Sequence, residues 1–445
     1  MTSLRTLTEP ARSTPVIAET EVLVLGGGPA GIAAAAAAAQ AGRRTLLVER
    51  YGFLGGMGTA AGVTNFCGLH ANVFGRIEQV VHGIVDELLD RMRRCDGLSE
   101  PHALFGGKIA AQAYDNPAFK IGADELLASR GVRLLFHAYA AGVLMRSPSQ
   151  VEALLVETKS GRGAITAEVF IDCSGDADLA VAAGVPFEKD ELLYPSTMFR
   201  IHGVDDARAG DAWNRFDALM AEAEARGRRF PRKTPIVRPQ KHAGEWRANV
   251  TQLANPDGSP VDGTDAWQLS AGELEGRRQI VGFMDFLRSS APGFEGAYLL
   301  EIAPQLGIRE TRRVVGEIQL SDADVLGCAR FADSIGVNGW PIEAHIAGDV
   351  TFEFPPGLGT HQGVNQLPLR MILPRVVDNL LVAGRCASMT HRGQSAARVS
   401  GACFVMGEAA GSVAALALQG GVTPRAVPAA ELQRTLQQQG VFLGA

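Results

Sequence analysis

The sequence predicts an α/β fold in which a domain built on a parallel sheet is interrupted by an inserted α+β domain. The first observation is a short apolar run, Val22–Leu25, that leads through a glycine-rich turn into an alanine-rich helix expected at Ile32–Gln40. The second is that the alternation of strand and helix patterns stops near residue 189 and returns near residue 365. The third is a buried strand pattern at Asp378–Gly384, followed by a long helix of small residues. Together these features are typical of a parallel-sheet domain that carries one insertion.

The glycine-rich turn satisfies the GxGxxG pattern with Gly26, Gly28 and Gly31. In this pattern the first glycine allows the tight turn, the second lets backbone N–H groups approach a pyrophosphate, and the third lets helix and strand pack closely. The helix N-terminus then faces the phosphates with the positive end of its dipole. Glu49 ends the next strand, Thr45–Val48, where an acceptor for a ribose hydroxyl is expected. We therefore predict a Rossmann-type dinucleotide-binding unit.

The segments beside this unit are assigned from local pattern. Residues 1–20 are expected to be a flexible lead-in that ends in an extended piece, because Pro15 disfavours helix. The glycine-rich segment 51–68 is expected to lie against a flat cofactor ring, where large side chains would not fit, with a mobile loop as the alternative. The remaining expected elements are helices at 76–94 and 117–130, a parallel strand at 132–136, and an antiparallel meander with strands at 142–146, 151–158 and 165–171.

The middle of the chain is interpreted as an inserted cap. Within it we expect a strand at 246–252 and a helix at 270–288. The segment 226–241 carries seven Lys and Arg residues and no acid, and we favour a solvated basic face over a site for an anionic substrate. The predicted domains are residues 1–188 and 366–445, which together form the nucleotide-binding domain, and residues 189–365, which form the cap.

Composition excludes several classes of function. A chain of 445 residues with a net charge of -6 has no domain-scale basic excess, so nucleic acid is not expected as a partner. The six cysteines are dispersed and form no CxxC, which argues for reduced thiols in the cytoplasm and against structural zinc or a redox dithiol. The N-terminus lacks the apolar core of a secretory signal, and no uninterrupted apolar stretch predicts a membrane span.

Several motifs, in order along nearly the whole chain, resemble those of the FAD-dependent oxidoreductase family. The family has a glutathione-reductase-type FAD fold and is distantly related to the fumarate reductase flavoproteins. The matching pieces are GGGPAG with Glu49, GFLGGMGT, IDCSGDADLA, GIRETRR, and NLLVAGRCASMTH followed by GACFVMGEAAG. The resemblance implies FAD as cofactor, bound by a domain whose two halves meet around one flavin while the cap closes over its ring. No metal is expected.

The motifs and the resemblance together give the residues expected at the cofactor. The helix that begins near Ser400 is expected to direct its unpaired N–H groups at the flavin ring. The full expected set is Gly26, Gly28, Pro29, Ala30, Gly31, Glu49, Arg50, Gly56, Met57, Asp176, Gly384, Arg385, Ser400 and Gly401.

Three residues are the candidates for catalysis. His391 lies in the loop that follows the returning parallel strand, where open α/β sheets bind ligands, and is expected to accept or orient a substrate proton. Arg309 is expected to anchor a polar or anionic group of the substrate. His361, which follows a probable turn at PPGLGT, is the second candidate for the base. The alternative for His391 and His361 is a hydrogen-bonded loop histidine, and the alternative for Arg309 is pairing with Glu310 or Glu317.

Three classes of function stay open, with an oxidation as the leading one. The chain is expected to dehydrogenate a small organic molecule by hydride transfer to flavin N5. A flavin monooxygenase with an external reductant is the second class, although Gly384-Arg385 replaces the Gly-Asp of the common hydroxylase signature and no second GxGxxG is present for NAD(P)H. The third class is an FAD-binding protein without turnover, or a sulfur-transfer enzyme of the thiazole synthase type. The substrate, the electron acceptor and the oligomeric state, a homo-oligomer included, are not fixed by the sequence.

Overall fold

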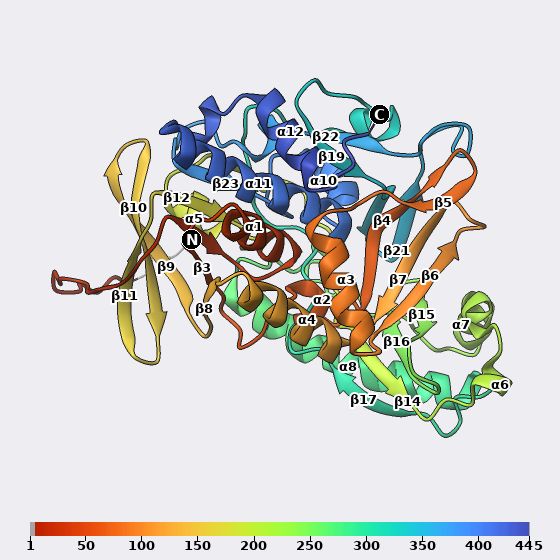
Figure 1. Cartoon of the computed structure of the whole chain (residues 1–445). Coiled ribbons are helices and arrows are strands. Elements are labelled where there is room, and N and C mark those ends of the chain that lie inside the picture. The colour runs from red at the N-terminus through yellow and green to blue at the C-terminus, as the bar shows by residue number, and fades with distance from the viewer. Residues whose placement is uncertain (1–4, 445) are drawn as a thin grey trace.

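A computed structural model describes residues 5–444 and is built around a five-stranded parallel sheet (Figure 1). Residues 1–4, part of the expected lead-in, and residue 445 lie outside the described residues. The strand order is β23-β12-β2-β3-β8. These strands are β2 (Val22–Leu25), β3 (Thr45–Val48), β8 (Arg133–Leu135), β12 (Val169–Asp172) and β23 (Leu380–Val382). The predicted α/β fold with one parallel sheet is therefore confirmed, and its outermost strand comes from the C-terminal segment.

The two faces of this sheet are covered differently. Val22 and Val24 of β2 belong to the core that includes helix α1 (Pro29–Gln40), whereas Leu23 belongs to a second core beneath an antiparallel meander. The meander order is β1-β11-β10-β9. Its strands are β1 (Val16–Glu19), β9 (Tyr139–Ser147), β10 (Gln150–Thr158) and β11 (Gly161–Thr166). The expected strand at 165–171 is therefore two strands, because β11 ends at Thr166 and β12 of the parallel sheet begins at Val169.

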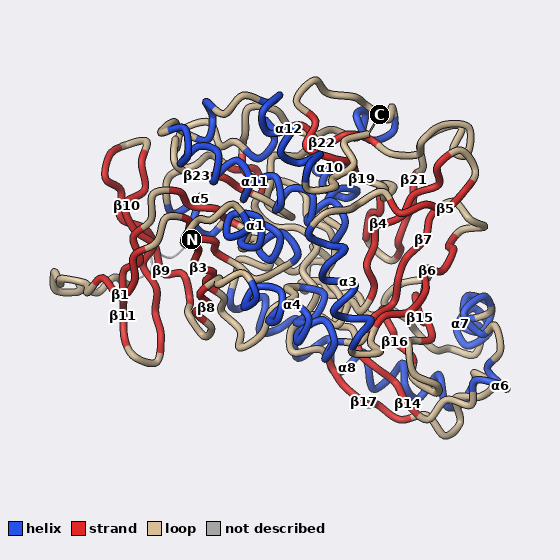
Figure 2. The backbone as a smooth tube through the Cα atoms, in the orientation of Figure 1, coloured by secondary structure: helices blue, strands red, loops and turns tan. Residues whose placement is uncertain are grey.

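Helices separate the meander from a second antiparallel sheet that the sequence did not predict (Figure 2). This sheet has the order β5-β4-β7-β6. Its strands are β4 (Asn65–Val73), β5 (Arg76–Gln79), β6 (Leu98–Leu104) and β7 (Ile109–Tyr114), and the helices near it are α2 (Met57–Ala60), α3 (Ile84–Arg94) and α4 (Asn116–Ser129). The helix expected over 76–94 is thus wrong in its first part. Gly83 has φ +98, and the helix starts only after it, where the Ile84 N–H donates to the Glu408 carboxylate at 3.0 Å.

The middle of the chain contributes another four-stranded sheet with a core of its own, in the order β15-β16-β14-β17. The 25-residue helix α8 (Ala266–Ser290) packs against it and includes the helix expected at 270–288. The other elements of this region and of the return to the first domain are β13 (Phe187–Glu188), β14 (Phe199–His202), α6 (Asp206–Ala209), α7 (Phe216–Ala225), β15 (Ile236–Pro239), β16 (Trp246–Asn249), β17 (Tyr298–Ile302), β18 (Arg313–Val314), α9 (Asp322–Leu326), β19 (Ser334–Asn338), β20 (Ile342–Ile346), β21 (Asp349–Glu353) and β22 (Asn365–Pro368). The exact domain boundaries stay predictions.

The C-terminal segment closes the nucleotide-binding domain with α10 (His391–Ala397), α11 (Ser400–Gly420) and α12 (Ala429–Gln438), while α5 (Asp178–Ala182) follows β12 in the first segment. Helix α11 lies directly on α1, and glycines make this approach possible. A Cβ on Gly407 or Gly411 would overlap backbone atoms of Ala30 or Ala34. Among residues 5–444, α11 alone is long and apolar enough to cross a membrane by length and composition, and 89% of its most apolar window is buried inside the protein. The sequence-based reading that no such stretch exists is corrected by this helix, which serves here as a core element.

Candidate active site

A cavity of about 590 Å³ lies where the nucleotide-binding domain meets the cap. Its lining combines the glycine-rich turn and Glu49, here called the nucleotide end, with cap residues that include Arg247 and Arg309, here called the cap end. The C-terminal segment supplies Gly384 and Ser400 to the same lining. Its volume is in the range of cofactor and ligand pockets.

The glycine turn has the features of a diphosphate cradle. A Cβ on Gly31 would overlap the carbonyl oxygen of Gly26, and one on Gly26 would overlap that of Cys173, so both glycines are required by packing alone. Gly28 differs, because it lines the cavity and its Cβ would meet only the Gly56 Cα, at 3.6 Å. Gly28 is also the N-cap of α1, whose first turn has no side-chain cap. The backbone N–H groups there are free for an anion.

Glu49 lines the cavity and also braces the turn. Its Oε2 accepts a hydrogen bond from the Gly27 N–H at 2.6 Å, and its Oε1 accepts one from the Tyr51 N–H at 3.0 Å. Burial raises the pKa of this carboxyl, against the lowering effect of these two hydrogen bonds. Each carboxylate oxygen has further acceptor capacity, so a ribose hydroxyl can be added without breaking either contact.

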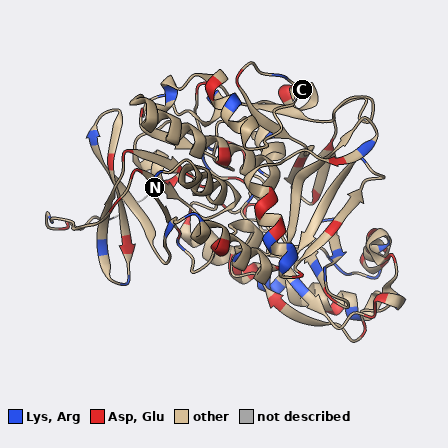
Figure 3. Ribbon diagram, in the orientation of Figure 1, with Lys and Arg blue, Asp and Glu red and all other residues tan. Residues whose placement is uncertain are grey.

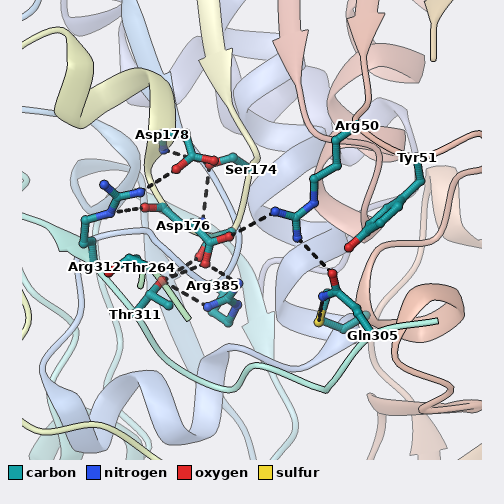
Figure 4. Close-up of polar contacts among 12 residues, drawn as sticks. Arg50, Tyr51, Ser174, Asp176, Asp178, Thr264, Gln305, Thr311, Arg312 and Arg385 are labelled. Atoms are coloured by element: carbon teal, nitrogen blue, oxygen red, sulfur yellow. Dashed lines mark hydrogen bonds and ion pairs between the residues drawn. The ribbon is translucent and has the colours of Figure 1, made fainter. Parts of the chain in front are cut away.

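Asp176 holds two cavity-lining arginines that come from different segments (Figure 4). Its Oδ1 accepts from Arg385 Nη2 at 2.8 Å and from Thr311 Oγ1 at 2.9 Å, and its Oδ2 lies 3.8 Å from Arg50 Nη1. Burial alone would raise the pKa of Asp176, but the charges of Arg385 and Arg50 lower it. Asp176 does not line the cavity itself. It positions the two cations that do, near the glycine turn.

The other expected cofactor residues divide into lining and supporting positions. Pro29, Ala30, Gly56, Met57 and Ser400 line the cavity, as do Gly384 and Arg385. The Ser400 hydroxyl ties the start of α11 to β4, because it accepts from the Cys67 N–H at 3.0 Å and donates to the Cys67 carbonyl at 3.1 Å. Gly401 is behind the lining, and a Cβ there would overlap the backbone of Gly68.

Buried arginines make up much of the cap-side wall. Arg247 and Arg309 are each 5% exposed, and both line the cavity together with Arg398 and Arg238. Arg309 donates to the Tyr194 carbonyl at 2.7 Å and to Asn249 Oδ1 at 3.3 Å, so neutral groups rather than the expected acids receive its hydrogen bonds. Glu310 pairs instead with Arg313, at 2.9 Å, and Glu317 pairs with Arg425.

Glu343 is the carboxylate among these arginines. Its Oε1 lies 2.9 Å from His345 Nε2, and its Oε2 accepts from Trp340 Nε1 at 2.8 Å. Burial would raise its pKa, but the hydrogen bond from His345 and the charges of His345 and Arg398 hold the pKa far below its ordinary value. Burial also lowers the pKa of His345. At neutral pH, Glu343 is therefore a fixed negative charge.

The two histidines expected at the cavity lie outside its lining, and this placement is corrected. His391 is the first residue of α10, and its Nδ1 faces the buried Glu310 Oε2 at 2.8 Å. His361 sits in a loop, where its Nδ1 accepts from the Gly363 N–H at 3.0 Å and its Nε2 lies 3.1 Å from the Pro356 carbonyl. His361 matches the alternative interpretation of a hydrogen-bonded loop histidine, whereas His391 begins a helix and its Nδ1 lies beside a buried carboxylate. Of the three catalytic candidates, only Arg309 reaches the cavity.

Sequence reasoning missed Arg247, Arg398 and Glu343, since none of them belongs to a recognisable motif; they lie in β16, directly after α10 and in β20. The basic segment 226–241 was a sequence feature that could have indicated arginines at the cavity. Two of its arginines are not part of a solvated face, because Arg232 is 2% exposed and Arg238 lines the cavity.

Taken together, the cavity residues fit FAD. The open N–H groups at Gly28 and the two arginines on Asp176 suit a diphosphate, and Glu49 suits a ribose. Among residues 5–444, no group of three or more His, Cys, Asp or Glu side chains is placed to hold a metal ion.

Comparison with known proteins agrees with this fit. The family model described as FAD dependent oxidoreductase matches residues 21–436. A geranylgeranyl bacteriochlorophyll reductase-like protein from Thermoplasma acidophilum superposes with a TM-score of 0.50 at 13% identity, over 95% of this chain and 84% of that one. The p-nitrophenol 4-monooxygenase of Pseudomonas putida superposes with a TM-score of 0.50 at 13% identity, over 96% of this chain and 90% of that one. No curated protein matches the sequence. At these identities the two structures are evidence for the fold alone.

Proposed function

This chain belongs to the FAD dependent oxidoreductase family, and on that premise we propose that it dehydrogenates a small organic substrate. The bound FAD supplies the acceptor for a hydride from the substrate carbon. The protein supplies the binding site, the orientation of the substrate and the exclusion of water.

The observation that carries this proposal is one continuous cavity with two chemically different ends. The nucleotide end has the glycine turn, Glu49 and the Asp176 network, and the cap end has Arg309 and Glu343. A cofactor held at the first end leaves the cap residues free to hold a second molecule beside it. Proximity of two bound reactants in a closed site is itself a large part of catalysis.

The cap residues are fixed before a substrate arrives. Arg309 is tied to Tyr194 and Asn249, and Glu343 to Trp340 and His345. Their hydrogen bonds hold the side chains in one geometry, so little reorganisation is needed on binding. Arg309 then serves to bind and orient a substrate group.

Anaerobic mixing of the holoprotein with a panel of small metabolites tests the proposal. A substrate alone should bleach the flavin absorbance near 450 nm (an approximate position for oxidised flavin) in a single turnover. The control is the same mixing with NADH or NADPH in place of the substrate.

The competing outcome is a monooxygenase, the reaction named for the Pseudomonas putida protein of similar fold. In that case NAD(P)H, or a partner reductase with it, would bleach the flavin and the substrate alone would not. That pattern would contradict the proposed dehydrogenation.

A further inference from the structure

We propose that the substrate is a small organic acid whose carboxylate is bound by Arg247, Arg309 and Arg398 at the cap end of the cavity. This inference rests on the proposed function for the reaction, and on the cavity itself for the chemistry of the ligand.

Arg247 is the first observation, because its guanidinium is buried with almost no protein partner. It extends from β16 and is 5% exposed. Its only hydrogen bond among the described residues is a weak one from Nη1 to the Met198 sulfur, at 3.9 Å, and its Nε has no partner. Burial lowers the pKa of this guanidinium to about 10. A buried cation without a counter-charge is costly for a folded protein, which is the situation that a bound anion relieves.

The neighbouring arginines, Arg309 and Arg398, also have no carboxylate ion-pair partner among the described residues. Arg309 donates only to neutral oxygens, and Arg398 donates to the Glu343 backbone carbonyl at 3.2 Å while its Nε has no partner. Among the ion pairs between residues 5–444, none includes Arg247, Arg309 or Arg398. The pKa of each of these three guanidinia is lowered by burial first, and for Arg309 by the charges of Arg398 and Arg232 next.

The charge balance at this wall favours an anion. The cavity-lining guanidinia of Arg238, Arg247, Arg309 and Arg398 outnumber the two cap carboxylates in the lining, Glu343 and Asp217, and Glu343 already contacts His345 and Trp340. Arg232 adds a further buried cation behind His345, at 3.4 Å from its Nδ1. The wall therefore has a surplus of positive charge and of free N–H donors.

A carboxylate matches these donors better than a neutral group does. A guanidinium presents parallel N–H bonds in a planar fork, and a carboxylate accepts two of them at once. Other cations are available for the diphosphate of FAD. These are Arg50 and Arg385, which contact Asp176 beside the glycine turn. The cap-end arginines are thus left for a second anionic molecule.

Equilibrium binding to the holoprotein tests this directly, without turnover. The probes are three acids with their neutral amides: lactate and lactamide, succinate and succinamide, benzoate and benzamide. Binding is read from the shift of the flavin spectrum and of the melting temperature. At least one acid should bind, and its amide about 10–100-fold more weakly, as expected for the loss of charge-assisted hydrogen bonds. Inorganic phosphate serves as the phosphate arm.

Substitutions test whether the cap-end arginines cause the tighter binding of the acid. Arg247→Gln should weaken binding of that acid by about 10–100-fold while FAD stays bound, and Arg247→Lys should restore part of it. The matched control is Arg208→Gln, since Arg208 is an exposed cap arginine paired with Glu295. It should leave binding unchanged.

The outcomes separate the two proposals. Tight binding of an acid, with no compound of the metabolite panel bleaching the flavin unless NAD(P)H is added, would support the carboxylate site and contradict the dehydrogenation. A neutral compound that bleaches the flavin, while no acid binds, would do the reverse. Equal binding of acid and amide, preference for the phosphate arm, or loss of FAD from Arg247→Gln would each overturn the carboxylate site.

Discussion

Glu49 carries two functions in a single side chain, and its removal tests both. Glu49→Ala removes the acceptor for a ribose hydroxyl and the hydrogen bond from the Gly27 N–H. A hydrogen bond to a charged group is worth ~1.5–3 kcal/mol, so FAD affinity should fall about 10–150-fold. Equilibrium dialysis against FAD measures this. The control is Glu21→Ala, an acid that contacts Arg43 and Arg44 away from the cavity, and equal FAD affinity in Glu49→Ala and the parent protein would contradict the role.

We expect His391 to affect how the free energy of unfolding depends on pH, rather than catalysis. The hydrogen bond with Glu310 raises the pKa of its imidazole above the ordinary 6.5. A raised pKa means that the stabilisation is fully present below pH 6.5 and is lost as the pH rises through the folded-state pKa. His391→Gln, which keeps a donor but cannot titrate, should therefore cost more stability at pH 6 than at pH 8, by up to about 1 kcal/mol.

Urea unfolding of both proteins at the two pH values measures that difference. Other shifted histidines, such as His82 and His345, are present in both proteins, so their contributions cancel. If His391→Gln changes the free energy of unfolding by the same amount at pH 6 and at pH 8, the pair of His391 and Glu310 is not ionised as described.

At the residue scale, the sequence predicted site residues only where a motif determines the backbone conformation. Gly26, Gly28, Gly31 and Glu49 were identified because a phosphate-binding turn permits few alternatives. Arg247 could not be found, because its importance depends on which residues surround it after folding. Its one hydrogen-bond partner among the described residues, Met198, is 49 positions away in the chain.

At the element scale, the contact between α11 and α1 gives a sharp test of packing. A Cβ on Gly411 would overlap the Ala34 carbonyl, whereas one on Gly420, at the end of the same helix, would meet only the Val422 side chain at 3.6 Å. Gly411→Ala should therefore destabilise the protein by about 1–3 kcal/mol through overpacking. Gly420→Ala should be neutral or stabilising by up to about 1 kcal/mol, because alanine is the better helix former.

Chemical denaturation of the two alanine variants compares the same substitution at two places in one helix. Because Ala34 belongs to α1, whose first-turn residue Ala30 lines the cavity, Gly411→Ala is expected to lower FAD occupancy as well. Equal stability of the two variants would mean that the helices are not in close contact.

Elements whose local sequence is distinctive were predicted well, and those that depend on partners were not. Helices α1 and α11 were predicted from runs of alanine and other small residues beside glycines, and α4 and α8 from local helix patterns. The sheet of β4–β7 was missed because its strands contain glycine, proline and polar residues, and each is stabilised mainly by pairing with the others. Helix α3 starts late because Glu408, a residue 324 positions away, accepts the first N–H.

At the scale of the whole molecule, charges of both signs are spread over the ribbon in view (Figure 3), while the cavity concentrates arginines between the domains. Those cations are held by residues from the first, middle and last parts of the chain. Asp176 connects Arg50 with Arg385, and Thr311 contacts both Asp176 and Arg385. A cofactor bound in this cavity would lie against all three parts, so its removal should affect the stability of the whole molecule.

This coupling predicts that FAD, and not FMN, stabilises the apoprotein. His70 in β4 does not line the cavity, and we expect FAD to be bound non-covalently, so acid precipitation should release a yellow supernatant. Free FAD at about 100 times its Kd should then raise the stability of refolded apoprotein by ~2.7 kcal/mol, by mass action on the folded state. FMN lacks the adenosine half that the glycine turn and Glu49 would bind, so at the same concentration it should raise the melting temperature much less. Equal protection by FMN would mean that the ring site holds the cofactor alone, and would contradict the nucleotide cradle at Gly28.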